Sequence, residues 1–322
     1  MSKTIKIWLT AAASLILLGM VIFGIAACSA GGDFSKFNTD DYETNTHEIS
    51  EDFSNLSINT DTADILFAPS DDGICKVVCH ELEKENHLVS VSDGTLKINT
   101  STSEKKWYDY IEISVGSPKI TVYLPKTEYV SLFISEDTGD IEISKNFKFE
   151  NVDISSSTGD VKFLASVSNL MKVKTSTGDI CVENISATSL DLSVTTGKVT
   201  VLGANLTGDV TVSASTGKAH LTNVTCKNLI SSGSTGDISL NNVIATEKLS
   251  IERSTGDVNF DLSDASEIVV KTDTGNVTGT LLSEKVFITK TDTGKVNVPN
   301  SAVGGKCEIT TDTGDIKLQI QN

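Results

Sequence analysis

The sequence has few aromatic side chains and little positive charge. Aromatic residues make up 6% of the 322 residues, so a core must be built mainly from valine, isoleucine, leucine and smaller side chains, which suit β-strands. The 26 basic residues are outnumbered by 43 acidic ones, which gives a net charge of -17 at pH 7. Nucleic acid and anionic lipid headgroups would repel such a chain, so neither is expected as a partner.

Long hydrophobic runs are absent except for one near the start. Ile7 to Ala27 is an uncharged stretch of 21 residues that follows Lys3 and Lys6. As a helix rising about 1.5 Å per residue, it would span a bilayer core. Acidic residues follow it, so the positive-inside rule places the bulk of the chain outside the cell.

Two other fates of this segment stay open. The sequence Ile25-Ala26-Ala27-Cys28 resembles a bacterial lipobox with Cys28 as the lipidated residue, and plain secretion after cleavage is the third reading. An uncleaved anchor is favoured because the apolar region of a cleaved signal is usually shorter. The expected organisation is a cytoplasmic stub (1–6), a transmembrane anchor or lipoprotein signal (7–27), a linker (28–45), an N-terminal β-rich cap (46–130) and repeats (131–322).

The dipeptide Thr-Gly recurs every 19 or 20 residues through the second part of the chain. With few exceptions, apolar residues occur three and five positions after the threonine and four positions before it, with polar residues between them, which indicates two strands flanking a corner. The corner glycines are Gly139, Gly159, Gly178, Gly197, Gly217, Gly236, Gly256, Gly275, Gly294 and Gly314.

A strand-turn-strand unit of this length cannot bury its apolar face alone. Stacking each unit on the next would place equivalent residues in columns, which predicts an all-β fold: a single-stranded parallel β-helix (β-solenoid) of about ten coils. Right-handed winding is the default for parallel connections. Within the cap, residues 55–69 resemble a degenerate coil with Ala63 in place of the glycine. The C-terminal coil has no visible cap, so self-association through it is a further expectation.

The repeat also weakens the catalytic interpretations. Asp-Thr-Gly, the signature of aspartic proteases, occurs at Asp137, Asp273, Asp292 and Asp312, but all four occupy one repeat position that elsewhere holds serine or threonine. Polysaccharide-cleaving β-helix enzymes carry grouped carboxylates and basic residues on long loops, and the near-constant coil length leaves no room for such loops. The chain has a single arginine, Arg253, and four histidines that do not cluster in sequence. No catalytic residue, no cofactor and no enzymatic activity are expected, with a polysaccharide-active enzyme as a minor alternative.

Stacked carboxylates leave one possibility for metal binding. Carboxylates about 5 Å apart repel one another, and Ca²⁺ would relieve that repulsion, although a solvated face with interspersed lysines is the simpler reading. The candidate ligands are Asp273, Asp292, Asp312 and Asp315. Apart from Cys28, the cysteines are mainly expected to be buried thiols, and Cys307 falls on an apolar column. Cys181 falls on an outward column and is the best candidate for a reactive thiol.

The "SINTDTADI", "WYDYI" and "KITVYLPKTEY" segments, together with the serial "STGD" corners, resemble a bacterial family of unknown function, the β-strand-repeat "putative adhesin" proteins of Firmicutes. The resemblance covers about residues 46–322 and implies a cell-surface β-solenoid without catalytic residues. The expected function is a membrane-tethered, adhesin-like binding or scaffold module at the cell envelope, with a glycan or a surface protein as partner. The alternative is a regulatory ectodomain of an envelope-stress system acting through the cap around Trp107 and Tyr110.

Overall fold

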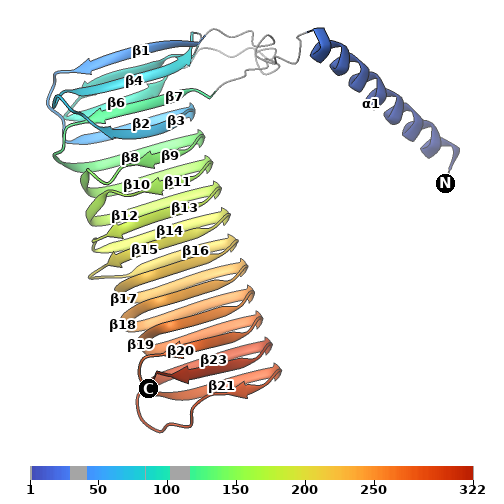
Figure 1. The fold of residues 1–322 in the computed structure, drawn as a ribbon, viewed down its shortest axis with the longest axis vertical. Helices are drawn as coiled ribbons and strands as arrows, with labels where there is room; N and C mark the ends of the chain where they lie inside the picture. The colour runs from blue at the N-terminus through green and yellow to red at the C-terminus, as the bar shows by residue number, and fades with distance from the viewer. Residues whose placement is uncertain (1, 30–41, 84, 102–116, 322) are drawn as a thin grey trace.

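The computed structural model describes residues 2–29, 42–83, 85–101 and 117–321. Among these residues the single helix is α1 (Lys3–Ser29), and every other regular element is a β-strand (Figure 1). Within α1, the 21 residues from Ile5 to Ile25 are long and apolar enough to cross a membrane, judged by length and composition. The helix predicted from the uncharged run is therefore present.

The strands fall into a cap group and a repeat group. The first group is β1 (Tyr42–Ile49), β2 (Asn55–Thr62), β3 (Asp64–Pro69), β4 (Cys75–Leu82), β5 (His87–Ser92), β6 (Thr95–Thr100) and β7 (Lys119–Leu124). The second group is β8 (Glu128–Thr138), β9 (Ile141–Ile143), β10 (Lys148–Thr158), β11 (Val161–Phe163), β12 (Ser166–Thr177), β13 (Ile180–Ile185), β14 (Ser189–Thr196), β15 (Val199–Asn205), β16 (Val210–Thr216), β17 (Ala219–Thr235), β18 (Ile238–Thr255), β19 (Val258–Thr274), β20 (Val277–Leu281), β21 (Lys285–Thr293), β22 (Val296–Asn297), β23 (Gly305–Thr313) and β24 (Ile316–Ile320).

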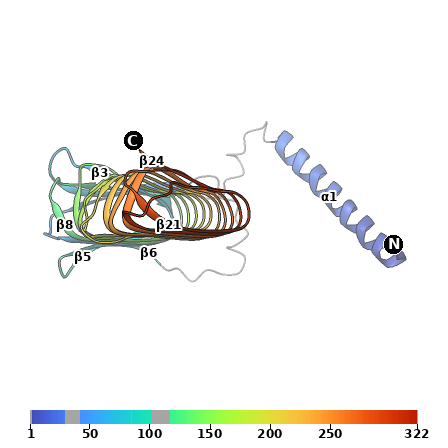
Figure 2. The ribbon, with the colours of Figure 1, turned by 90° about the horizontal axis from the view of Figure 1, so that it is seen from below.

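Each repeat forms one coil of a parallel β-solenoid, as the sequence predicts. A strand runs into the Thr-Gly corner, a second strand leaves it, and both pair in register with their equivalents in neighbouring coils, for example β10 with β8 and β12. The segments that run into the Thr-Gly corner form the first sheet, and the segments that leave it form the second sheet. The two sheets face one another and enclose a flattened core, which is visible when the molecule is viewed from one end (Figure 2). The inward side chains, such as Ile154, Val173 and Leu192, stack in columns and are fully buried.

The first corner of each Thr-Gly coil requires glycine because neighbouring backbones touch there. Gly217 has a φ of +152°, and an added Cβ atom would lie 1.7 Å from the carbonyl oxygen of Gly197 in the preceding coil. The amide of Gly197 donates to the carbonyl of Thr216 at 3.0 Å, so a backbone hydrogen bond joins the adjacent coils beside this close approach. No side chain fits between backbones at this spacing.

The coils have a second corner, which the sequence analysis missed. Seven residues after the threonine, Asn184, Asn223 and Asn242 adopt φ values between 51° and 56°, and Gly203 has 73°. Asparagine and glycine tolerate this left-handed conformation better than other residues. The Asn242 side-chain amide also donates to Oδ1 of Asn223 at 2.8 Å, which joins two neighbouring coils at the second corner.

At the N-terminal end, the order of the coils in space differs from their order in the chain. The strand pair β2 and β3 forms the degenerate coil expected at 55–69, and Thr62 pairs in register with Thr138 of the next coil. This coil lies between β8/β9 on one side and β6/β7 on the other. The antiparallel strands β1, β4 and β5 lie beyond β6 and β7 and cover the end of the core (Figure 1).

The C-terminal end shows the same arrangement and corrects the expectation of simple sequential stacking. The last coil in the chain, β23 and β24, is inserted between β19/β20 and β21/β22, so the outermost coil is the one before it in sequence (Figure 1). Val296 of that outermost coil stands on an inward column, next to the buried Ile316, and is 45% exposed, so the apolar core is partly open at this end. Self-association remains a prediction, but it would involve β21 and β22.

A buried ion pair fixes the inserted coil. Lys285 of β21 pairs in register with Gly305 of the inserted strand β23. The Nζ atom of Lys285 nevertheless lies 2.5 Å from Oδ1 of Asp264, which belongs to β19 on the far side of β23. Gly305 has no side chain, so the lysine can pass over the inserted strand. Because a buried charge without its partner is strongly destabilising, this pair favours the observed order of coils over a sequential one.

The contact at the first corner can be tested with one substitution. We expect Gly217→Ala to lower the free energy of unfolding by about 3 kcal/mol or more, because the added carbon overlaps a backbone carbonyl that cannot move independently of its ladder. The control is Gly73→Ala, where φ is +76° but nothing lies within 4 Å of the added atom, so only about 1 kcal/mol should be lost. Urea unfolding measures both, and equal losses would contradict the contact.

Candidate functional site

The aspartates that follow the corner glycines bind the backbone of the neighbouring coil. Oδ1 of Asp140 accepts from the amide of Asp160 at 2.8 Å, and Oδ1 of Asp160 accepts from the amide of Asp179 at 2.7 Å. The same bond joins Asp179 to Lys198. The recurrence of aspartate at this position is therefore explained by coil-to-coil hydrogen bonding.

The calcium candidates lie at exposed corners near the C-terminal end. Because the last coil is inserted, Asp312 lies on the coil between those of Asp273 and Asp292. Asp315 uses one carboxylate oxygen to accept from the amide of Lys295 at 2.8 Å. Calcium binding by these residues remains a prediction.

Two positions before the corner threonine, each coil contributes a residue to a column that faces the core. Several side chains of this column are polar. Thr175 and Thr272 are 0% and 1% exposed. In the same column, Arg253 is 1% exposed and passes Gly233 to donate to the carbonyl of Ala214 at 3.3 Å and to Ser231 at 2.8 Å. Burial lowers the pKa of its guanidinium. The chain's single arginine is thus a structural residue inside the solenoid.

Glu136 occupies this column at the junction of the cap and the repeats. Its side chain is buried, pairs in register with Thr60, and both carboxyl oxygens lack a hydrogen-bond partner within the described residues. Burial, and then the charges of Asp64 and Asp140, raise the pKa of Glu136 to about 8. This carboxyl is therefore largely protonated at neutral pH.

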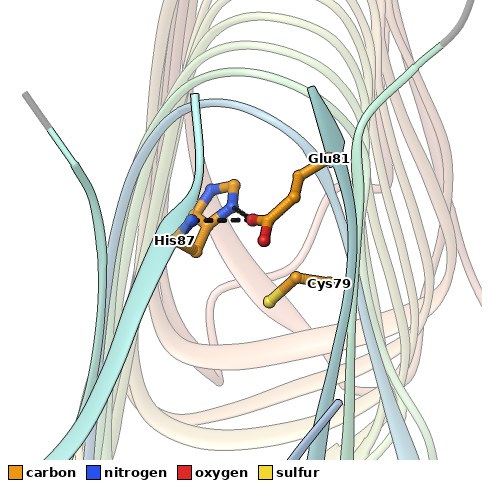
Figure 3. Close-up of side chains that lie close together, drawn as sticks. All are labelled: Cys79, Glu81 and His87. Atoms are coloured by element: carbon orange, nitrogen blue, oxygen red, sulfur yellow. Dashed lines mark hydrogen bonds and ion pairs between the residues drawn. The ribbon is translucent and has the colours of Figure 1, made fainter. Parts of the chain in front are cut away.

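A compact group of polar side chains closes the core at the N-terminal end. Cys79 and Glu81 point inward from β4, and His87 points toward them from β5 on the facing sheet (Figure 3). All three are buried, and one ligand atom of each lies within 4.8 Å of the others. We call Cys79, Glu81 and His87 the cap cluster.

Hydrogen bonds hold the cap cluster in place from both sides. Oε2 of Glu81 lies 2.7 Å from Nδ1 of His87 and accepts from the His87 amide at 2.7 Å. Oε1 of Glu81 accepts from Asn45 at 2.8 Å, and Nε2 of His87 lies 2.9 Å from the Thr60 hydroxyl. Burial, followed by the charge of Glu81, raises the pKa of the Cys79 thiol to about 12. These contacts fix the orientation of both the carboxylate and the imidazole.

The order Thr60, His87, Glu81 matches a hydroxyl, a base and an orienting carboxylate, the arrangement that activates nucleophiles. The Thr60 side chain is buried, however, so a substrate could reach it only if the cap opened. The sequence analysis missed this cluster. Its only sequence signal is the alternation of Cys79 and Glu81 on one strand face, followed by His87 after a short turn.

The outer surface of the second sheet carries files of uncharged hydrogen-bonding groups. Four residues after the threonine, five consecutive coils present a hydroxyl, imidazole or amide group, each paired in register with the next. We call these residues the polar file: Thr200, His220, Ser239, Asn259 and Thr278. The outer surface of the first sheet is charged instead, with ion pairs such as Lys248–Glu267 at 3.5 Å.

The predicted cysteine environments are confirmed. Cys75, Cys79, Cys226 and Cys307 are buried, and Cys181 is partly exposed on the outer surface of the second sheet. Burial, and then the charge of Glu183, raise the pKa of Cys181, so this thiol is less reactive than its position alone indicates. Trp107 and Tyr110, the residues of the regulatory alternative, lie outside the described residues.

The chain belongs to the Toastrack DUF4097 family, whose model matches residues 53–213 and 203–322. This finding agrees with the resemblance seen in the strand segments and the serial corners. No curated protein matches the chain.

Several solved bacterial structures resemble the chain along most of its length. One is a "putative lipid binding protein" from Parabacteroides distasonis, with 17% identity, 86% of this chain and 97% of that chain covered, and a TM-score of 0.47. Another is a "putative adhesin" from Parabacteroides merdae, with 12% identity, 88% and 98% covered, and a TM-score of 0.46. A third is a "putative cell adhesion protein" from Clostridium sporogenes, with 11% identity, 87% and 100% covered, and a TM-score of 0.27.

The buried carboxyl of Glu136 predicts a pH dependence of stability. Its pKa is higher in the folded chain, about 8, than the ordinary value of 4.5, so only the folded chain holds this proton between those two values. Protonation of Glu136 therefore stabilises the folded chain fully below about pH 4.5, and this stabilisation declines as the pH rises to about 8.

Glu136→Gln should remove this decline and make the protein more stable than wild type by about 3 kcal/mol at high pH, and by much less at pH 4. The control is Glu128→Gln, an exposed glutamate on the same strand. Denaturant unfolding across the pH range measures the difference, and parallel profiles for wild type and Glu136→Gln would refute it.

Proposed function

We propose that the chain is a membrane-tethered, extracellular β-solenoid that acts as a non-catalytic, adhesin-like binding module at the bacterial cell envelope. In this proposal, α1 provides the tether, and the polar file on the second sheet provides the binding surface. The favoured partner is an envelope glycan.

The observation that carries the proposal is the uncharged character of the polar file in a chain with a net charge of -17. Beside it, Thr222, Asn241 and Thr280 extend the uncharged surface on the same sheet, interrupted only by Asp261. Hydroxyl and amide groups both donate and accept hydrogen bonds, which suits the hydroxyl groups of a sugar chain.

The spacing of the file also fits an extended partner. Adjacent strands in a sheet lie about 4.8 Å apart, so five coils present equivalent groups along about 19 Å. A flat row of this kind offers many weak contacts in place of the single deep pocket that a small ligand needs. Repeated contacts along one polymer would give useful affinity although each is weak.

The proposal can be tested by cosedimentation of the detergent-solubilised full chain with purified, insoluble cell-wall glycan. We expect wild-type protein to sediment with the glycan and Ser239→Arg, which places a bulky charge in the polar file, to reduce the bound fraction at least about tenfold. Ser250→Arg is the matched control, because Ser250 lies on the same strand but on the outer surface of the first sheet. It should bind within about twofold of wild type.

Two results would contradict the proposal. Absence of binding to the glycan would remove the glycan as partner, and equal losses in both variants would show that the polar file is not the binding surface. Capture of an envelope protein that depends on Ser239 would replace the glycan with a protein partner.

A further inference from the structure

We propose that the cap cluster is a binding site for a single zinc ion, with Sγ of Cys79, a carboxylate oxygen of Glu81 and Nδ1 of His87 as ligands. This inference does not depend on the binding function of the polar file. It concerns a different end of the molecule and a ligand of different chemistry.

The donor set favours zinc over the hard cations. Zinc is bound in proteins by thiolate, imidazole and carboxylate groups, whereas Ca²⁺ and Mg²⁺ take oxygen ligands almost exclusively. The three donors of the cap cluster supply one group of each kind. The four aspartates considered for calcium supply oxygen alone, so the two sites would select different metals.

The geometry requires only small side-chain shifts. Bonds of about 2.0–2.3 Å in a tetrahedral zinc site separate neighbouring ligand atoms by about 3.3–3.6 Å. The three ligand atoms already lie within 4.8 Å of one another, and Oε2 of Glu81 and Nδ1 of His87 are 2.7 Å apart. The carboxylate and the imidazole would move apart by less than about 1 Å to admit the ion.

The groups behind the ligands have the arrangement typical of metal sites. Metal-binding histidines usually contact an oxygen group through the second ring nitrogen, and metal-binding carboxylates are themselves hydrogen-bonded. Here Nε2 of His87 lies against Thr60, and Oε1 of Glu81 accepts from Asn45, which leaves Nδ1 and Oε2 directed at each other. Both ligands are therefore held in orientation before a metal arrives.

Binding has a simple proton balance. A neutral His87 that binds zinc through Nδ1 carries its proton on Nε2, next to the Thr60 hydroxyl, and the thiol proton of Cys79 passes to the solvent. The three ligands leave one coordination position for water. On the same inner face, Nε2 of His47 is buried without a hydrogen-bond partner among the described residues, so a further nitrogen donor is available in the cap.

The position of the site gives zinc a structural consequence. Cys79 and Glu81 belong to β4 and His87 to β5, which lie on opposite sheets at the N-terminal end of the core (Figure 3). Among the described residues, these strands are joined by the short segment between Leu82 and His87 and by the contacts of the cluster. A metal bound to both would fasten the two sheets together where the stack of coils ends.

The test uses the full chain in detergent, stripped of metal with a chelator and titrated with zinc chloride. We expect one zinc per chain, a dissociation constant below about 1 µM, and a melting temperature raised by about 3 °C or more. Cobalt chloride in place of zinc should produce the sulfur-to-metal charge-transfer band of a thiolate-bound ion. Calcium chloride should change nothing at this site.

Cys79→Ser should weaken zinc binding at least about tenfold and abolish the charge-transfer band. Cys75→Ser is the matched control, because Cys75 is buried on the same face of the same strand but lies outside the cap cluster. It should keep both the affinity and the band.

Three results would overturn the proposal: no zinc bound above background, no charge-transfer band with wild-type protein, or equal loss of binding in the two cysteine variants. The cobalt spectrum of the wild-type chain decides the question even if Cys79→Ser fails to fold.

Discussion

The structure depends on the close approach of backbones at the Thr-Gly corner. There the carbonyl oxygen of one coil occupies the space where a side chain on the next coil would lie, as between Gly197 and Gly217. Because each corner must lie directly over the last, the strands on both sides are held in register. The buried columns, the aspartate ladder and the outward files all follow from that register.

The sequence predicts this architecture because glycine spacing and period-two alternation each have a single geometric meaning. The glycine recurs where two backbones meet, and the alternation separates core residues such as Ile154 from solvent-facing ones such as Asp153. The second corner escaped notice because asparagine, glycine and leucine share its left-handed conformation, as at Asn184, Gly203 and Leu262, so no single residue type marks it.

The order of coils at the two ends could not be predicted for a physical reason. Repeats that present the same columns are interchangeable as neighbours, so the repeat itself carries no information about which coil lies beside which. The order is selected by individual contacts that the pattern does not contain. At the C-terminal end one of these is the pair of Lys285 and Asp264, which forms across the strand that holds Gly305.

The two candidate sites also differ in whether the repeat pattern predicts them. The polar file could be derived from the repeat, because residues such as His220 and Ser239 occupy one outward position. The cap cluster could not, because the meeting of Glu81 and His87 depends on the irregular antiparallel strands that cover the end of the core. The four predicted calcium ligands belong to three corners. These corners follow one another in a different order in space than in the sequence.

The order of coils gives the most direct test of the account, through disulfide formation between engineered cysteines on the outer surface of the first sheet. Val269 pairs in register with Glu308, and Glu308 pairs with Ile288. Neighbouring strands lie about 4.8 Å apart, within reach of a disulfide, whereas positions two strands apart, at about 9.6 Å, are not. Mild oxidation followed by peptide mass spectrometry should therefore show a bond in Val269→Cys/Glu308→Cys and none in Val269→Cys/Ile288→Cys. The reverse result would mean that the coils stack in sequence order, and a bond in neither variant would mean that they do not stack in this register.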